Sequence, residues 1–302
     1  MKYFKTENSR IAKRYKITKQ EFSKVTERKF PFEQKNSKDV ISQYGICPSC
    51  LNPIQLIGVV KEIKRTPYGK HTGKDIEGLP KWNQRKYEYC PYAVKNDHKS
   101  PDDEEKIMEI DDNIIELYNL LKNQFDRVVF IIEKELKIKC SIYFWEKSLN
   151  QFCVNQFYLY PWLTESNLPY IFAYFGLLHQ RVYKQKVLIG SEIYNTLSDY
   201  PGIELIQIDN RYAEISNKEG CFLNLYFRFV NHQQQVTEGE ELKESMLFCI
   251  DDRNNGETIF EQKLEFSETY FSNVINKQEN SKKRNYKLLE MAKKLMPSLK
   301  ST

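Results

Sequence analysis

Residues 47–50 read Cys-Pro-Ser-Cys, and this step decides how the first third of the chain is expected to fold. His71 follows in Tyr-Gly-Lys-His, and Cys90 follows in Tyr-Cys-Pro-Tyr. A Cys-x-x-Cys step places two thiolates on one tetrahedral ion, and a later histidine and cysteine complete the four ligands of a closed site. The sequence therefore predicts a structural zinc (Zn²⁺) site made of Cys47, Cys50, His71 and Cys90.

Only the first pair of ligands has a diagnostic spacing, so the fourth ligand stays open. His98 or Asp97 is an alternative to His71, and Cys140 is a candidate from the following segment. A redox role for the Cys-x-x-Cys pair would need a helix to begin after it, because the helix dipole lowers a thiol pKa. The motif is followed by Leu-Asn-Pro-Ile and then by strand-like sequence, which disfavours a redox pair.

Composition places the chain among folded proteins. It has 302 residues, of which 40% are hydrophobic and 14% aromatic, so it can bury a sizeable core. No run approaches the ~18 apolar residues of a membrane span, and the start lacks the apolar core of a signal peptide. We therefore expect a cytoplasmic protein without a membrane span. In that reducing compartment a Cys-x-x-Cys step favours metal binding over a disulfide.

Charge is unevenly distributed along the chain. Residues 1–99 hold 22 Lys/Arg against 10 Asp/Glu, residues 100–276 hold 16 against 29, and residues 277–302 hold 8 against 2. Together with the pattern of apolar residues, these shifts predict four segments. They are a basic arm at 1–39, a zinc-binding module at 40–99, an acidic α+β domain at 100–276 and a basic amphipathic C-terminal helix at 277–302.

The fold class expected from periodicity is α+β, with a small N-terminal zinc-binding module followed by a mixed or antiparallel sheet domain with a few helices. Helical spacing and capping residues predict helices over 102–124, 169–179 and 191–197 and a last helix from Ser281. Apolar runs bounded by turn residues predict strands at 54–63, 127–133, 203–208, 211–215, 221–230, 245–251 and 257–266.

Two function classes stay open for the basic module. Lys81, Trp82, Arg85 and Lys86 interleave cations with an aromatic ring, a pattern that can hold phosphates and stack bases of DNA or RNA. The leading hypothesis is a nucleic-acid-associated protein with a structural zinc module. The alternative is a zinc-stabilised structural or protein-interaction module, in which the acidic domain binds a protein partner.

A third hypothesis is a metal-dependent nuclease. Asp251 and Asp252 end an expected strand, and Glu261 and Lys263 follow in a Glu-x-Lys step on the next one. Such carboxylates can hold Mg²⁺, which activates the attacking water and stabilises the transition-state phosphate. The competing interpretation is an ordinary solvent-exposed hairpin without a catalytic role, because acid-x-Lys steps arise easily in a chain that is 29% charged. His232 is expected in an exposed turn at the end of a strand.

Overall fold

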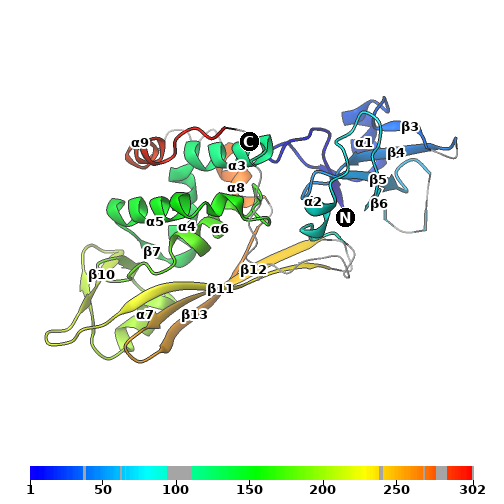
Figure 1. The fold of residues 1–302 in the computed structure, drawn as a ribbon. Helices are drawn as coiled ribbons and strands as arrows, with labels where there is room; N and C mark the ends of the chain where they lie inside the picture. Colours follow the sequence, from blue (N-terminus) through cyan, green and yellow to red (C-terminus); the bar gives the residue numbers. More distant parts are fainter. Residues whose placement is uncertain are drawn as a thin grey trace. The chain divides into compact units, whose positions relative to one another are not determined.

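The computed structural model describes residues 1–36, 39–61, 63–64, 66–93, 110–237, 241–267, 269–276 and 284–300. It is a mixed α+β protein with several antiparallel sheets (Figure 1). The chain divides into two compact units by its contacts. Unit 1 is Met1–Glu105 with Gln234–Lys243, and unit 2 is Lys106–Gln233 with Glu244–Thr302. This division differs from the charge-based one, since it groups residues 1–39 with the cysteine-bearing segment.

Unit 1 is built on a four-stranded antiparallel sheet in the order β3-β4-β5-β6. Its elements are β1 (Tyr3–Phe4), β2 (Tyr15–Lys16), α1 (Lys19–Thr26), β3 (Glu33–Lys35), β4 (Ile41–Ile46), β5 (Pro53–Ile57), β6 (Tyr68–His71) and α2 (Gln84–Glu88). The strand expected over 54–63 ends earlier, at Ile57. Gly58 follows at φ 79°, a left-handed conformation that turns the chain away from the sheet.

The N-terminal residues belong to the core of unit 1. Phe4 and Phe22 are fully buried in one cluster with Cys47, Cys50 and Cys90. Gly45 lets the Phe4 ring approach β4, because a Cβ there would lie 2.9 Å from a ring carbon. The basic residues of this segment are therefore anchored in a folded unit.

Two of these basic residues brace the segment that carries the first cysteine pair. Lys5 is 2% exposed and donates hydrogen bonds to the carbonyls of Ser9 and Arg10, at 3.0 and 2.7 Å. Arg10 in turn donates to the carbonyl of Ser49, inside the Cys-x-x-Cys step, at 2.7 Å. The N-terminal segment is thus hydrogen-bonded to the turn 47–50 through the Ser49 carbonyl.

Unit 2 combines helices with two antiparallel sheets of order β7-β8-β10-β9 and β11-β12-β13. Its helices are α3 (Asp112–Asn123), α4 (Phe125–Leu136), α5 (Ile142–Val154), the short 3₁₀ helix η2 (Phe157–Leu159), α6 (Leu168–Gly176), α7 (Glu192–Asp199), α8 (Tyr270–Asn276) and α9 (Tyr286–Leu295). Its strands are β7 (Ile138–Lys139), β8 (Lys186–Leu188), β9 (Ile203–Gln207), β10 (Tyr212–Asn217), β13 (Glu257–Glu265) and most of β11 (Leu225–Val236) and β12 (Leu242–Asp252). Residues 234–236 of β11 and 242–243 of β12 belong to unit 1.

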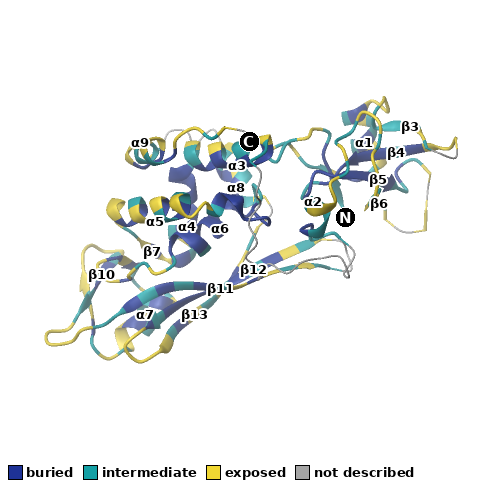
Figure 2. Cartoon of the chain, in the orientation of Figure 1, coloured by how far each residue is buried: buried dark blue, intermediate teal, exposed yellow. Residues whose placement is uncertain are grey.

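The core of unit 2 lies among its helices. α6 is largely buried (Figure 2), with eight of its nine residues in the core. Phe172 packs edge-on against Phe125 of α4. α9 packs against α3, α4 and α5, and its Leu288 and Ala292 are buried. The Arg284 guanidinium, just before α9, makes two hydrogen bonds of 2.8 Å to the buried Asp126 carboxylate.

Several expected elements differ in the structure. The strand expected over 127–133 is wrong, because these residues lie in helix α4. The apolar run from Val128 to Ile132 hid the period, which is visible only when Phe125 and Leu136 are included at helical spacing. The helix expected over 102–124 is described from Asp112 onward, and its expected start lies outside the described residues, as does Ser281.

His232 also differs from expectation. β11 continues through Gln233 to Val236, and the His232 side chain is only 1% exposed. The expectation of an exposed turn was therefore wrong, because a polar Asn-His-Gln-Gln-Gln stretch continues a strand whose alternate residues face the core. Among the residues that the structure describes, no helix is long and apolar enough to cross a membrane.

Candidate metal centre

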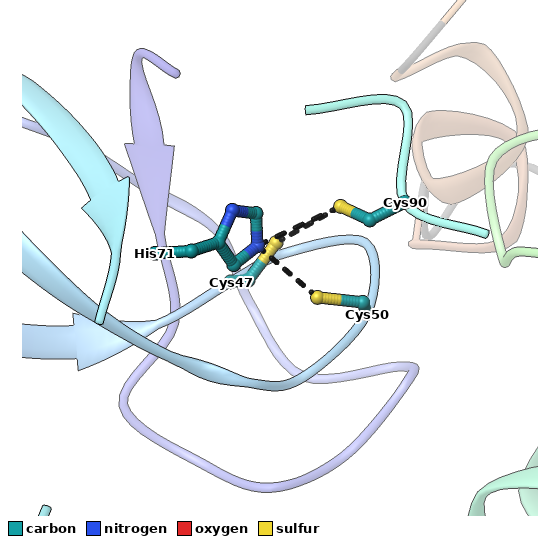
Figure 3. A group of neighbouring side chains, drawn as sticks. All are labelled: Cys47, Cys50, His71 and Cys90. Atoms are coloured by element: carbon teal, nitrogen blue, oxygen red, sulfur yellow. Dashed lines mark hydrogen bonds between the residues drawn. The ribbon is translucent and has the colours of Figure 1, made fainter. Parts of the chain in front are cut away.

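Four side chains meet in unit 1. One ligand atom each from Cys47, Cys50, His71 and Cys90 lies within 4.8 Å of the other three (Figure 3). The three cysteines are buried, with exposed fractions of 3% or less. Within the described residues this is the one group of its kind, and it could hold a metal ion such as zinc.

The distances between these atoms fit a tetrahedral ion. Zn–S bonds of about 2.3 Å and Zn–N bonds of about 2.05 Å give tetrahedral edges of about 3.8 Å between two sulfurs and about 3.6 Å between sulfur and nitrogen. The Sγ atoms of Cys47 and Cys90 are 3.8 Å apart. The Nε2 atom of His71 lies 3.2 Å from Cys50 Sγ and 3.7 Å from Cys90 Sγ. The donor set is that of a closed tetrahedral site, and two of these three distances agree with it, whereas the His71–Cys50 distance of 3.2 Å is shorter than the tetrahedral edge.

Without a metal ion, the pKa values of the clustered side chains shift in different directions: that of Cys47 falls, and those of His71 and Cys90 rise. Burial opposes ionisation of Cys47, but hydrogen bonds from Cys50 and Cys90 and the charge of His71 outweigh it and lower its pKa well below the ordinary value. Burial likewise opposes the His71 cation, yet the Cys47 charge raises the His71 pKa to about 10. Burial, together with the neighbouring sulfurs, raises the pKa of Cys90. These shifts favour a thiolate on Cys47 beside a protonated His71.

Local structure explains how the sequence brings the ligands together. The turn 47–50 connects β4 to β5, where Leu51 donates its backbone N–H to the Cys47 carbonyl at 3.1 Å and takes φ 60°. His71 ends β6, in register with Ile54 of β5. α2 then leads into Cys90, whose N–H bonds the Tyr87 carbonyl at 2.9 Å. A strand rather than a helix follows the Cys-x-x-Cys step, as expected for a metal knuckle rather than a redox motif.

Asn52 is a supporting residue that the sequence reasoning missed. It is 1% exposed, and its amide lies 3.4 Å from Cys50 Sγ, where it can donate to the sulfur. The same amide donates to the Asn83 carbonyl at 2.9 Å, and its Oδ1 accepts the Asn83 N–H at 2.7 Å. Donors to ligand sulfur orient metal ligands and tune them. The position of an asparagine two residues after the Cys-x-x-Cys step was the available signal.

Of the candidate nucleic-acid-binding residues Lys81, Trp82, Arg85 and Lys86, Trp82 contacts the His71 ring. The Trp82 ring packs on the rings of Tyr87 and His71, with centroids 5.1 and 6.1 Å away. Lys81 and Arg85 are exposed, whereas Lys86 and Trp82 are half-buried. Trp82 therefore covers a ligand ring, and the cations lie on the helix and loop beside it.

The alternatives for the fourth ligand have different outcomes. Asp97 and His98 lie outside the described residues. Cys140 lies in unit 2, between β7 and α5, and the four-residue group does not include it. His71 is the residue whose imidazole the structure places among the three sulfurs.

The acidic candidates are engaged in other interactions. Asp251 binds the guanidinium of Arg228 and accepts from the Thr258 hydroxyl at 2.8 Å. Asp252 is 1% exposed and accepts hydrogen bonds from the Tyr200 hydroxyl at 3.1 Å and the Asn254 N–H at 2.9 Å.

The other two nuclease candidates, Glu261 and Lys263, lie on β13, the strand paired with β12. Glu261 lies opposite Cys249 on β13, and the Lys263 ammonium lies 3.5 Å from the Glu265 carboxylate. In the described part of the chain, Asp251, Asp252 and Glu261 do not form a group of potential metal ligands.

Comparison with known proteins gives no match: no family model, curated protein or solved structure is similar to this chain.

Proposed function

We propose that Cys47, Cys50, His71 and Cys90 bind one structural Zn²⁺ ion that holds unit 1 together. The observation that carries this proposal is the buried convergence of three sulfurs and one imidazole nitrogen within 4.8 Å. Three thiolates and a neutral imidazole fill all four positions of a tetrahedral ion and leave none for substrate. The ion would contribute folding free energy, because the unfolded chain holds no preformed site.

The zinc proposal is tested by elemental analysis of the purified full chain. We expect about one zinc per chain, as a single closed site requires. Cys90→Ser should reduce the zinc content and lower the unfolding temperature of unit 1. Cys221→Ser is the matched control, because Cys221 is exposed and lies in unit 2. Full-length protein purified without chelator that holds no zinc would refute the proposal.

We propose further that unit 1 associates with nucleic acid through the surface beside His71. Residues 1–99 carry a net charge of +12, and Lys81 and Arg85 are exposed and close to Trp82 in sequence. Cations that neutralise phosphates release counterions, which gives binding a steep salt dependence. The zinc would then act indirectly, since it fixes the loop and helix that carry the cations.

The nucleic-acid proposal is tested by retention on immobilised DNA and RNA across a salt series. Reversing charge at Lys81, Arg85 and Lys86 should weaken retention and flatten its salt dependence. The matched control reverses charge at Lys16, Lys19 and Lys24, which are exposed elsewhere on unit 1. If the parent is not retained at low salt, the alternative of a zinc-stabilised protein-interaction module is favoured instead.

A further inference from the structure

Unit 2 contains a cavity of about 610 Å³. None of its lining residues belongs to the cluster of Cys47, Cys50, His71 and Cys90. Its walls are the first turns of α5, the chain from His179 to Lys186, Glu214 of β10 and Tyr226 of β11 (Figure 1 shows these elements). The volume falls in the range of small-molecule sites, roughly 300–1,000 Å³. We call it the lysine–tyrosine pocket, after its lining residues Tyr143, Lys147, Arg181, Tyr183, Lys184 and Tyr226.

The pocket concentrates positive charge in an acidic part of the chain. Lys147, Arg181, Lys184 and Lys186 line it, against the single carboxylate of Glu214. All four cations are exposed. Residues 100–276 hold 16 Lys/Arg against 29 Asp/Glu, so a quarter of the cations of this segment gather at one hollow. Such focusing attracts an anionic ligand to the pocket rather than to the rest of unit 2.

Each of three cations is paired with a tyrosine of the same pocket. The Lys147 ammonium lies 4.6 Å from the centre of the Tyr143 ring, and that of Lys184 lies 5.5 Å from the Tyr183 ring. Arg181 donates to the Tyr226 hydroxyl at 3.1 Å.

The tyrosine side chains are also accessible. Tyr143 is 61% exposed and Tyr183 is 39% exposed, although both are large aromatic residues. Exposed rings beside cations form the combination that stacks bases and holds the phosphates between them.

Hydrogen bonds hold the frame of the pocket. Gln185 is 7% exposed, accepts the Ser141 N–H at 3.1 Å and donates to the Tyr183 carbonyl at 3.2 Å. Ser141 caps α5 by accepting the Phe144 N–H at 3.2 Å, and this helix end adds positive potential beside Lys147. These hydrogen bonds fix the backbone that carries the cations and the rings. Binding a ligand therefore costs less conformational entropy than it would if this backbone had to become ordered on binding.

We propose that the lysine–tyrosine pocket binds a nucleotide, with phosphate on Lys147, Arg181 and Lys184 and a base stacked on Tyr143 or Tyr183. The chemistry fits both a free nucleotide and one nucleotide of a single strand. It does not require the metal centre or the basic surface of unit 1, and it assigns a second, separate site in unit 2. An acidic peptide would satisfy the cations but would gain little from the exposed rings.

Calorimetric titration of the full chain tests this proposal. The probes are uridine 5′-monophosphate, a 5′-phosphorylated oligouridylate trimer, the deoxythymidylate trimer, a short duplex and a hexaglutamate peptide. Two variants change the pocket: Lys147→Gln with Lys184→Gln, and Tyr143→Ala with Tyr183→Ala. The matched control is Lys137→Gln with Lys218→Gln, two exposed lysines of unit 2 outside the pocket.

We expect a single-stranded trimer to bind more tightly than the duplex. The lysine variant should reduce the slope of log affinity against log salt by about 1.4, because each phosphate contact to a single strand contributes about 0.7. The tyrosine variant should weaken binding about tenfold or more while keeping that slope, since stacking is not electrostatic. Binding of the monophosphate with the same losses would identify a free nucleotide as the ligand.

Other results would overturn the proposal. These are trimer binding that is unchanged in both pocket variants, no binding of any nucleotide probe, or hexaglutamate binding as tight as trimer binding and insensitive to the tyrosine variant. Trimer binding that is lost only on charge reversal at Lys81, Arg85 and Lys86 would also refute the pocket, but would support the nucleic-acid surface on unit 1.

Discussion

Asn52 and Asn83 exchange two hydrogen bonds, one from the Asn52 amide to the Asn83 carbonyl and one from the Asn83 N–H to the Asn52 Oδ1. They connect the turn that carries Cys50 to the start of α2, which leads to Cys90. The Asn83 side chain has a separate task, because its Oδ1 caps α2 by accepting the Lys86 N–H at 2.9 Å. One asparagine therefore joins two ligand-bearing segments, and the other begins a helix.

Asn52→Ala should weaken zinc binding by about 10- to 100-fold, the usual cost of removing a group that orients metal ligands. Asn52→Asp should weaken it at least as much, because it removes the donor to Cys50 Sγ and adds a negative charge beside the thiolates. Competition with a chromophoric chelator measures both affinities.

Asn83→Ala is the matched control for this prediction. It removes the helix cap, worth about 0.5–2 kcal/mol, but keeps the backbone atoms that bond Asn52. Its zinc affinity should stay within about threefold of the parent, an effect smaller than a lost orienting group. Equal losses in Asn52→Ala and Asn83→Ala would show that Asn52 acts only through the fold.

Zinc affinity should rise steeply with pH. Zinc needs thiolates and a neutral imidazole, yet in the metal-free cluster the His71 pKa is raised to about 10 and the Cys90 pKa is raised well above its ordinary value. At neutral pH both groups hold a proton that the ion must displace, so acid opposes binding. These two displaced protons alone predict that affinity rises by at least about 100-fold per pH unit between about pH 6 and 8.

Chelator competition at several pH values, corrected for the chelator's own titration, measures that slope. In Cys90→Ser the serine hydroxyl does not ionise, so one proton fewer is displaced and the affinity change per pH unit should be about tenfold smaller than in the parent. An affinity of the parent that does not change with pH would contradict the proton displacement inferred from His71 and Cys90.

The Cys47–Cys50 pair was predictable from the sequence because a Cys-x-x-Cys step is a local signal, whereas the fourth member, left open by its spacing, is His71 in the cluster that the structure shows. The strands β9, β10, β12 and β13 were also close to expectation, since turn residues such as Asn254-Asn255-Gly256 bound their apolar runs. α7 begins after Ser191, as its capping residue predicts.

The remaining features depend on contacts that no short window contains. The sequence predicts a strand at α4 because all five residues from Val128 to Ile132 are apolar, so this run shows no helical spacing. The helical spacing of buried residues becomes visible only over the whole helix, which is 12 residues long. Asn52 gains its role from Asn83, which lies 31 residues away in sequence. The lysine–tyrosine pocket joins Tyr143 to Tyr226 across several elements, so its cations look dispersed in the sequence.

Arg284→Met should destabilise unit 2 by about 3 kcal/mol, because breaking a buried ion pair leaves a carboxylate without its cation. The Asp126 side chain is 2% exposed and also accepts the Asn285 N–H at 3.1 Å, so it cannot move into water without releasing the start of α9. Lys287→Met, at an exposed position of α9, is the matched control. Denaturant unfolding measures both.

Asp126→Leu combined with Arg284→Met should cost less than Arg284→Met alone, since replacing both members of a buried pair by apolar groups removes the stranded charge. A double variant that is less stable than the single one would mean that Asp126 stabilises unit 2 mainly through its other bond, the one it accepts from the Asn285 N–H.

His232→Leu should lower the free energy of unfolding by about 3 kcal/mol, because it removes a partner from a buried carboxylate. His232 Nε2 lies 2.6 Å from Glu244 Oε1, and Nδ1 lies 2.9 Å from the Tyr160 hydroxyl. Glu244 also accepts from the buried Asn167 amide at 2.8 Å. These four groups form one hydrogen-bonded network, and a leucine at position 232 can bond to none of the other three.

Gln233→Leu is the matched control for His232→Leu, because Gln233 is the adjacent, exposed residue of β11. It should change stability by no more than about 0.5 kcal/mol, as surface substitutions do. Denaturant unfolding followed by circular dichroism measures both variants. His232→Gln, which keeps a donor toward Glu244, should recover part of the loss. If His232→Leu unfolds at the same denaturant concentration as Gln233→Leu, the network does not stabilise unit 2.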